Sequence, residues 1–410
     1  MLTPTPLRDQ LSASRDDPLR VLIVGAGVAG VTLAQLLRRN GLHPVLVDRA
    51  APHADRGYML ALMPLVDPVL SELGVTDQYL DCSVELRRYR VRDRSGVPVR
   101  TYPMTTLFDR FGSYRGIGRG ELLEVLGSQG GSVTCRTTVT ALEQSTDAVR
   151  AVIDNGSGPQ VSEFDVVVAA DGLHSRTRGL ALGPHEVTTF DSGWGCWVAW
   201  TDPDDAADLC EEVWGAGLFV GCYPVQDRLG VVVGGPRTDT LIGPARFAAR
   251  AWGALRRVDD RFDRALAAVV CADDAYFWSL TDCRSAAWTT GRVVLLGDAA
   301  AGFLPTAGIG AGMAVESAGV LASRLRATSA DQLPSALRAY ERTQRPRVEA
   351  AQENSRRLAR LLFRRSPVLA AARDAAIRVL PLQATLGPIR ALLEQAPEHS
   401  HGATSNRAAG

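Results

Sequence analysis

The chain has 410 residues, of which 46% are hydrophobic and 22% are charged. These values exclude a disordered, collagen-like or disulfide-scaffold protein, and the length favours roughly two to three domains. The 45 basic residues balance the 45 acidic ones, so the net charge gives no indication of nucleic-acid binding. The seven cysteines are scattered and odd in number, which predicts neither a disulfide framework nor a metal site.

All 45 of the Lys and Arg residues are arginine. The absence of lysine excludes chemistry that depends on a lysine amine, such as Schiff-base formation. Residues 1–19 are polar and show no signal-peptide pattern, so we expect a flexible N-terminus and a cytoplasmic protein. No apolar run approaches the ~18 residues that a membrane-spanning helix requires, so no transmembrane segment is expected.

The first predicted unit is a short apolar strand at residues 21–24, followed by Gly25, Gly27 and Gly30 in a G-x-G-x-x-G pattern. Helical spacing comes next, and a second apolar strand ends at Asp48. In such a unit Gly25 permits the tight turn, Gly27 lets a pyrophosphate approach, and Gly30 lets helix and strand pack closely. Asp48 can accept a hydrogen bond from a ribose hydroxyl, so the unit predicts a dinucleotide-binding site.

Two later apolar strands also end beside a carboxylate. The strand at residues 166–170 leads into Asp171 and Gly172, and the strand at residues 292–296 leads into Asp298. Ligands of open α/β sheets bind at the carboxyl ends of the strands, so we expect these segments to meet there. A turn and a helix follow Asp298, and the turn contains Pro305, Gly308, Gly310 and Gly312.

Together these segments, with Arg119 at the start of a further predicted helix, resemble the FAD-dependent aromatic hydroxylase family. Its members are single-component flavoprotein monooxygenases with a fold like that of para-hydroxybenzoate hydroxylase, and the resemblance covers residues 20–357. It implies an α/β fold: a Rossmann-type FAD/NAD(P)-binding domain with an inserted antiparallel-sheet substrate domain and C-terminal helices.

The resemblance also implies a division of the chain. The FAD-binding domain would be discontinuous, the substrate sheet would combine two segments, and a helical region would follow, with flexible segments at both termini. The FAD-binding domain would comprise residues 20–80, 111–185 and 283–330, and the substrate sheet residues 81–110 and 186–282. The helical region would comprise residues 331–395, and the flexible termini residues 1–19 and 396–410.

Residue roles follow from the same resemblance. Arg119 would contact the flavin, and Asp298 would bond the ribityl chain. The turn from Pro305 to Gly312 would lie along the flavin ring and the pyrophosphate. Asp171 and Gly172 stand in a segment that the family associates with both FAD and NAD(P)H. Family members often carry histidine after G-D-A-A, whereas this chain has Ala301, which leaves the handling of protons without a candidate residue.

The activity implied is monooxygenation with noncovalent FAD, NAD(P)H as a transient co-substrate, and O₂. The oxygen would pass through a flavin C4a-hydroperoxide to hydroxylate or epoxidise an apolar or aromatic small molecule. The lysine-free, arginine-rich composition would suit a role in secondary metabolism. The alternatives are a flavin-dependent double-bond reductase and a non-redox, flavin-scaffolded cyclase. We expect a monomer or homodimer. The residues expected to line the substrate pocket are Trp194, Trp200, Trp214, Tyr223 and Phe303.

Three patterns allow two interpretations each. The tryptophans near residue 200 are typical of core packing as well as of a pocket wall. The arginine-rich run at residues 87–94 predicts a solvated hairpin or an anchor for the phosphates of NAD(P)H. The basic, amphipathic helical pattern at residues 356–380 predicts docking onto the FAD-binding domain or contact with a membrane surface.

Overall fold

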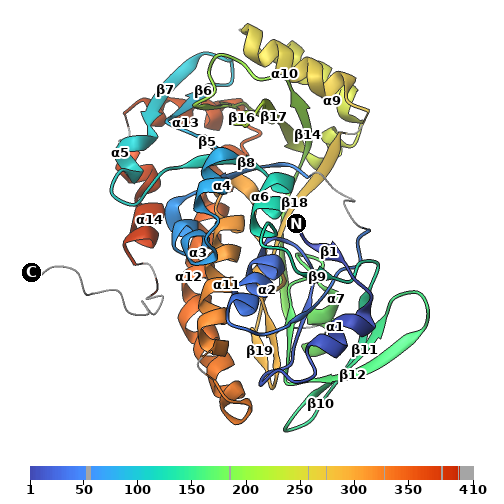
Figure 1. The fold of residues 1–410 in the computed structure, drawn as a ribbon. Coiled ribbons are helices and arrows are strands. Elements are labelled where there is room, and N and C mark those ends of the chain that lie inside the picture. The colour runs from blue at the N-terminus through green and yellow to red at the C-terminus, as the bar shows by residue number, and fades with distance from the viewer. Residues whose placement is uncertain are drawn as a thin grey trace, which may run out of the picture.

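The computed structural model describes residues 1–51, 57–183, 186–256, 258–273, 275–326, 328–379, 382–395 and 397. The predicted α/β class is confirmed. Figure 1 shows the large antiparallel sheet at one end of the molecule and a smaller parallel sheet at the other, with long helices along their side.

The parallel sheet has five strands in the order β19-β20-β13-β2-β3, and only β19 runs antiparallel to its neighbour. Side chains alternate between its faces, so Val21 and Ile23 pack on one side while Leu22 and Val24 pack on the other. The strands are β2 (Val21–Val24), β3 (Val45–Val47), β13 (Val166–Ala169), β19 (Thr289–Thr290) and β20 (Val293–Leu295).

Helices cover one face of this sheet, and α2 packs directly against α11. The helices and 3₁₀ turns of this half are α1 (Leu7–Ala13), α2 (Val28–Arg39), η1 (Pro64–Val66), α3 (Asp67–Leu73), α4 (Thr76–Asp81), α6 (Arg119–Leu126), α7 (Arg176–Ala181), η2 (Gly297–Ala299), η3 (Pro305–Ala307), α11 (Gly310–Arg326) and η4 (Ala330–Gln332).

Three small sheets complete this half. A three-stranded sheet packs on the second face of the parallel sheet, a second one lies near the cavity described below, and a two-stranded one joins the N-terminus to residue 133. Their strands are β10 (Thr138–Gln144), β11 (Val149–Asp154) and β12 (Pro159–Phe164); β4 (Met59–Leu62), β8 (Arg115–Gly118) and β5 (Val84–Glu85); and β1 (Thr3–Pro4) and β9 (Ser132–Val133).

The prediction of a flexible segment at residues 1–19 is wrong. β1 pairs with β9, and α1 packs against β3. The polar composition concealed two anchoring side chains, Leu7 and Gln10, which are both buried. The Gln10 side-chain amide donates to the Leu46 carbonyl and accepts from the Leu46 N–H, each at 3.0 Å. A polar residue thus extends the hydrogen bonding at the edge of the sheet. Of the predicted flexible C-terminus, only residue 397 lies within the described residues.

The antiparallel sheet has seven strands in the order β18-β14-β17-β16-β15-β6-β7. It gathers strands from residues 88–103 and 187–285, and α9 and α10 cover its outer face. Its elements are β6 (Arg88–Arg92), β7 (Pro98–Pro103), α5 (Met104–Phe108), β14 (Val187–Thr201), β15 (Leu209–Trp214), β16 (Phe219–Val225), β17 (Arg228–Pro236), α8 (Arg237–Thr240), α9 (Pro244–Ala254), α10 (Asp260–Cys271) and β18 (Tyr276–Ser285).

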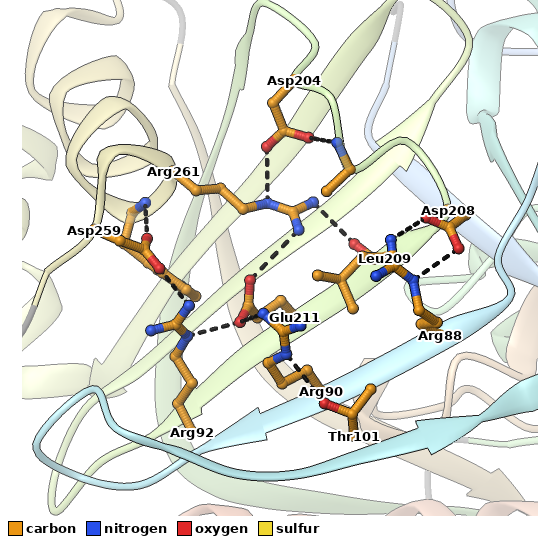
Figure 2. A network of polar contacts seen from close by, with 12 residues as sticks. Arg88, Arg90, Arg92, Thr101, Asp204, Asp208, Leu209, Glu211, Asp259 and Arg261 are labelled. Atoms are coloured by element: carbon orange, nitrogen blue, oxygen red, sulfur yellow. Dashed lines mark hydrogen bonds and ion pairs between the residues drawn. The ribbon is translucent and has the colours of Figure 1, made fainter.

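The arginine-rich run at residues 87–94 does form a hairpin, β6–β7, but the hairpin is not simply solvated. Arg92 is buried and donates to Glu211 at 2.7 Å and to Asp259. Arg90 donates to the same Glu211 at 3.2 Å. Figure 2 shows these guanidinium groups pointing toward the carboxylates between the sheet and α10. The charges of the run are therefore used to dock β6 onto β15 and α10.

Three helices end the described fold: α12 (Leu333–Leu362), α13 (Pro367–Val379) and α14 (Leu382–Glu394). The predicted continuous helix at residues 356–380 is interrupted after Leu362, so α12 and α13 are separate. Within α12, Arg356 forms a bidentate ion pair with the buried Asp282 of β18, at 2.7 and 2.9 Å. Among the helices of the described ranges, none combines the length and apolar character needed to cross a membrane.

Candidate active site

A cavity of about 420 Å³ lies between the carboxyl ends of the parallel strands and the inner face of the antiparallel sheet. Its first part, which we call the loop end, is lined by Gly27, Val28, Arg119, Gly172, Asp298 and residues 305–311. Its second part, which we call the aromatic chamber, is lined by Tyr89, Tyr102, Phe108, Tyr114, Glu212, Trp214, Phe219, Tyr223, Leu361 and Phe363.

The three glycines after β2 have different surroundings. Gly25 has a φ of +109°, and a Cβ added there would overlap the Ala170 carbonyl. A Cβ added to Gly30 would overlap the Gly25 carbonyl oxygen, so this residue must be glycine for α2 to approach β2. In contrast, a Cβ added to Gly27 would meet nothing within 4 Å. Gly27 therefore faces the open space of the loop end, whereas Gly25 and Gly30 are required by packing.

Asp48 and Asp171 each hold a loop in place and do not themselves line the cavity. Asp48 accepts from the N–H groups of Ala26 at 2.6 Å and Ala50 at 2.7 Å. Asp171 accepts from the Ser175 hydroxyl and, at 3.0–3.1 Å, from three groups at the start of α7. The predicted cofactor contact of Asp171 is therefore not supported by its position. Its bonds hold the turn that presents Gly172, whose added Cβ would meet open space.

Asp298 is the carboxylate of the loop end. Its side chain is exposed to the cavity, yet surrounding protein limits its contact with bulk water. This desolvation raises the pKa of Asp298 to about 6, and the positive charge of Arg119 opposes the rise. The carboxylate lines the cavity, so it can accept hydrogen bonds from the hydroxyl groups of a ligand.

The turn after Asp298 joins the loop end to the helices. η3 is followed by Gly308 at a φ of +60°, and α11 begins at Gly310. Pro305, Gly308 and Gly310 line the cavity, but Gly312 does not. A Cβ added to Gly312 would lie 3.2 Å from Leu65, so this glycine serves the packing of α11 against η1.

The loop end fits the dinucleotide that the resemblance implies. The first turn of α2 has no side-chain cap, and its N-cap residue is Gly27. Unpaired N–H groups at a helix N-terminus are suited to a pyrophosphate, and the space beside Gly27 lets one approach. Asp298 supplies an acceptor for sugar hydroxyls. Backbone donors, open space and a carboxylate are thus present along one wall.

The five residues expected to line the substrate pocket divide into two groups. Trp214, Tyr223 and Phe303 do line the cavity, whereas Trp194 and Trp200 do not. Trp194 stacks behind Phe363 with ring centroids 4.5 Å apart. Trp200 lies under the guanidinium of Arg228, 4.0 Å from its ring centroid. Both share the inner face with Cys196, but the cavity reaches only the middle of β14.

Sequence reasoning missed Glu212, the carboxylate that lines the aromatic chamber. This buried carboxylate accepts from the Tyr89 hydroxyl at 2.5 Å, the Tyr223 hydroxyl at 2.6 Å and the Trp214 indole N–H at 2.7 Å. Burial raises the pKa of Glu212, and the three hydrogen bonds limit the rise. The available signal was the pair of consecutive glutamates inside an otherwise apolar strand, Leu209–Trp214.

Comparisons with known proteins agree on one family. The model of the FAD binding domain matches residues 18–355. A flavin-dependent monooxygenase from an unknown prokaryotic organism is 27% identical over 337 residues, covering 76% of this chain and 82% of the relative. The 3-amino-4-hydroxybenzoate 2-monooxygenase PtnB3 of Streptomyces platensis is 30% identical over 337 residues, covering 76% and 81%.

Solved structures with low identity share the fold. Klebsiella pneumoniae HpxO, solved with FAD and uric acid, has a TM-score of 0.80 and 23% identity, covering 92% of this chain and 97% of HpxO. The tetracycline destructase Tet(55) has a TM-score of 0.70 and 21% identity, covering 92% and 98%. The chain is an oxidoreductase that binds FAD, and it belongs to the FAD-dependent aromatic hydroxylase family of flavin-dependent monooxygenases.

Proposed function

We propose that this monooxygenase uses NAD(P)H and O₂ to hydroxylate or epoxidise an aromatic or apolar small molecule held in the aromatic chamber. The observation that carries the proposal is the continuity of the cavity. The wall suited to a dinucleotide and the chamber lined by aromatic rings belong to one space, so a substrate in the chamber would lie beside the bound cofactor.

We assign the cofactor contacts to residues of the loop end: Gly27 and the start of α2 to the pyrophosphate, Asp298 to the ribityl chain, and Arg119 with the turn at 305–310 to the flavin ring. Among the described residues Asp48 accepts one hydrogen bond at each oxygen, so an acceptor position stays open on both, and we assign it to the ribose. We assign Gly25, Gly30, Asp171 and Gly312 to the shape of the loops. Bound FAD supplies the redox and oxygen-transfer chemistry, and the protein supplies binding, orientation and exclusion of water. We further assign the FAD-binding domain to the parallel-sheet half and the substrate domain to the antiparallel sheet.

The C-terminal helices support the exclusion of water. Leu361 and Phe363 at the end of α12, Ile377 of α13 and Ile389 of α14 all line the cavity with apolar side chains. Together with Phe303 they cover the side of the chamber that the sheet leaves open. Exclusion of water from the chamber limits side reactions of the activated oxygen with solvent.

NAD(P)H is assigned a transient role, because the chain contains a single G-x-G-x-x-G unit, at residues 25–30. We place its docking surface near Gly172 and Arg119, which both line the loop end. A role in secondary metabolism is part of the proposal and rests on the lysine-free composition.

The test measures oxygen and reductant together. The FAD-loaded enzyme is supplied with NADH or NADPH and with phenol, indole or styrene as probes, in isotopically labelled O₂. We expect a probe to accelerate NAD(P)H oxidation and to gain one labelled oxygen atom. Product formed at full rate without O₂, or labelled only from water, would contradict the proposal and favour the reductase or cyclase alternative.

A further inference from the structure

Two consecutive glutamates of β15, Glu211 and Glu212, point to opposite faces of the antiparallel sheet. Both are buried, with exposed fractions of 1% and 7%. Glu211 lies on the outer face and is paired with Arg90 at 3.2 Å, Arg92 at 2.7 Å and Arg261 at 3.4 Å. Figure 2 shows these guanidinium groups converging on Glu211. The charge of Glu211 is therefore fully compensated within the protein.

Glu212 lies on the inner face, and all three of its hydrogen-bond donors are neutral: Tyr89, Tyr223 and Trp214. In the part of the chain that the structure describes, no ion pair joins it to a basic side chain. Arg373 also lines the cavity, with its guanidinium 5.7 Å from the centroid of the Trp214 ring, but it donates to three other groups. These are the Asp374 carboxylate at 2.8 Å, the Leu362 carbonyl at 3.2 Å and the Trp214 carbonyl.

The position of Glu212 is fixed from several sides. Gly221 lies opposite it on β16, and a Cβ added to Gly221 would lie 2.6 Å from the Tyr223 ring. The absent side chain makes room for this ring, whose hydroxyl reaches Glu212 Oε1. Tyr89 stacks on Tyr102, with centroids 6.4 Å apart, which holds the second hydroxyl in place. The carboxylate is thus oriented before any ligand arrives.

The arrangement leaves one oxygen of Glu212, Oε1, able to accept a further hydrogen bond. Oε2 accepts from both Tyr89 and Trp214, whereas Oε1 accepts only from Tyr223 among the described residues. A carboxylate oxygen has about two acceptor positions, so Oε1 retains one. Because Glu212 lines the cavity, a ligand in the aromatic chamber can reach that position.

We propose that Glu212 is the specificity-determining residue of the aromatic chamber and binds a protonated amine of the substrate. This inference rests on the proposed function, which places the substrate in this chamber. A cationic amine would supply the missing counter-charge and a donor for Oε1, while a substrate carboxylate would meet an uncompensated like charge. The chamber therefore selects aromatic amines over aromatic acids of the same size.

The test compares ligands that differ in this group alone. Tyramine, 4-hydroxyphenylacetamide and 4-hydroxyphenylacetate are titrated into the oxidised, FAD-loaded enzyme at neutral pH, and binding is followed by the change in flavin absorbance. We expect tyramine to bind at least about tenfold more tightly than 4-hydroxyphenylacetate, with the neutral amide between them. In Glu212→Gln the preference should disappear while FAD remains bound.

The matched control is Glu143→Gln, which makes the same change at a mostly exposed carboxylate that does not line the cavity; this variant should retain the preference for tyramine. Equal affinities, tighter binding of the acid, no binding of tyramine, or a preference that persists in Glu212→Gln would each overturn the inference. The wild-type comparison decides even where a variant folds poorly. Binding is measured without turnover, so failure of the labelled-oxygen test would be a separate result.

Discussion

The cavity wall and the layer directly behind it consist of residues that are neighbours in sequence but differ in what surrounds them. Gly27 and Glu212 face the cavity, whereas Gly30 and Glu211 face packed protein. In the rear layer, the layer of residues behind the cavity wall, Gly30 is required by close backbone packing and Glu211 is paired with three arginines. At the wall, Gly27 faces open space, and Glu212 has neutral hydrogen-bond donors but no ion-pair partner among the described residues. This contrast distinguishes residues that build the fold from residues available to a ligand.

The contrast between the two glycines predicts the largest effects. Gly27→Val should fold but lose stoichiometric FAD, because its side chain would enter the space assigned to the pyrophosphate. Gly30→Val should fail to give folded protein, because its Cβ would overlap the Gly25 carbonyl. Circular dichroism and the flavin content of purified protein measure the two results. Full FAD occupancy in Gly27→Val would refute the assignment of this wall.

The two glutamates predict an intermediate effect on stability. Glu211→Gln should lower the free energy of unfolding by about 3 kcal/mol, because buried Arg92 and Arg261 lose a shared counter-charge. Glu212→Gln should change it by less than about 1 kcal/mol, because an amide can accept from Trp214 and donate to the Tyr223 hydroxyl. Urea unfolding of both variants checks this difference. An equal loss of unfolding free energy in the two variants would mean that the charges of Glu211 and Glu212 contribute equally to stability.

Asp298 predicts the smallest effect, on pH dependence. Its pKa is raised from 3.8 to about 6, so the folded apoprotein holds this proton more tightly than the unfolded chain does. The stability contributed by the protonated group is complete below pH ~4 and is lost as the pH rises through ~6. The change should stay below about 1 kcal/mol, because cavity water screens the carboxylate.

The measurement for this pH effect is the unfolding free energy of the apoprotein and of Asp298→Asn between pH 4 and 7. Asparagine does not titrate, so the stability of wild type relative to the variant should fall as the pH rises. A relative stability that rises instead would show that Asp298 is held as a carboxylate by partners stronger than Arg119.

Much of the loop end could be predicted from sequence because its parts are local. Gly25, Gly27 and Gly30 lie within six residues, and strand, turn and helix follow each other without a break. The loops after β13 and β20 were found in the same way. The structure altered only individual assignments there, such as Asp171, whose bonds run to the residues that follow it.

The aromatic chamber could not be predicted in the same way because its contacts are distant in sequence. Glu212 meets Tyr89, 123 residues earlier, only because β6 pairs in parallel with β15. The alternation of side chains along a strand places Trp194 and Trp200 on one face, but it does not show where along β14 the cavity ends. The burial of Arg92 likewise depends on Asp259 at the start of α10, which is distant in sequence from the hairpin and cannot be predicted from the hairpin sequence alone.

The order of strands in the parallel sheet has a consequence for synthesis of the chain. β13 lies between β2 and β20, so β13 lacks one of its two neighbouring strands until residue 295 has left the ribosome. The wall of the aromatic chamber is completed later still, by Phe363 and Ile377. A nascent chain that stopped before β20 would expose the backbone edge of β13, a strand of four buried apolar residues. Asp298 and the turn at 305–310 follow β20 directly, so retention of FAD and escape from aggregation would be acquired together once this segment has emerged.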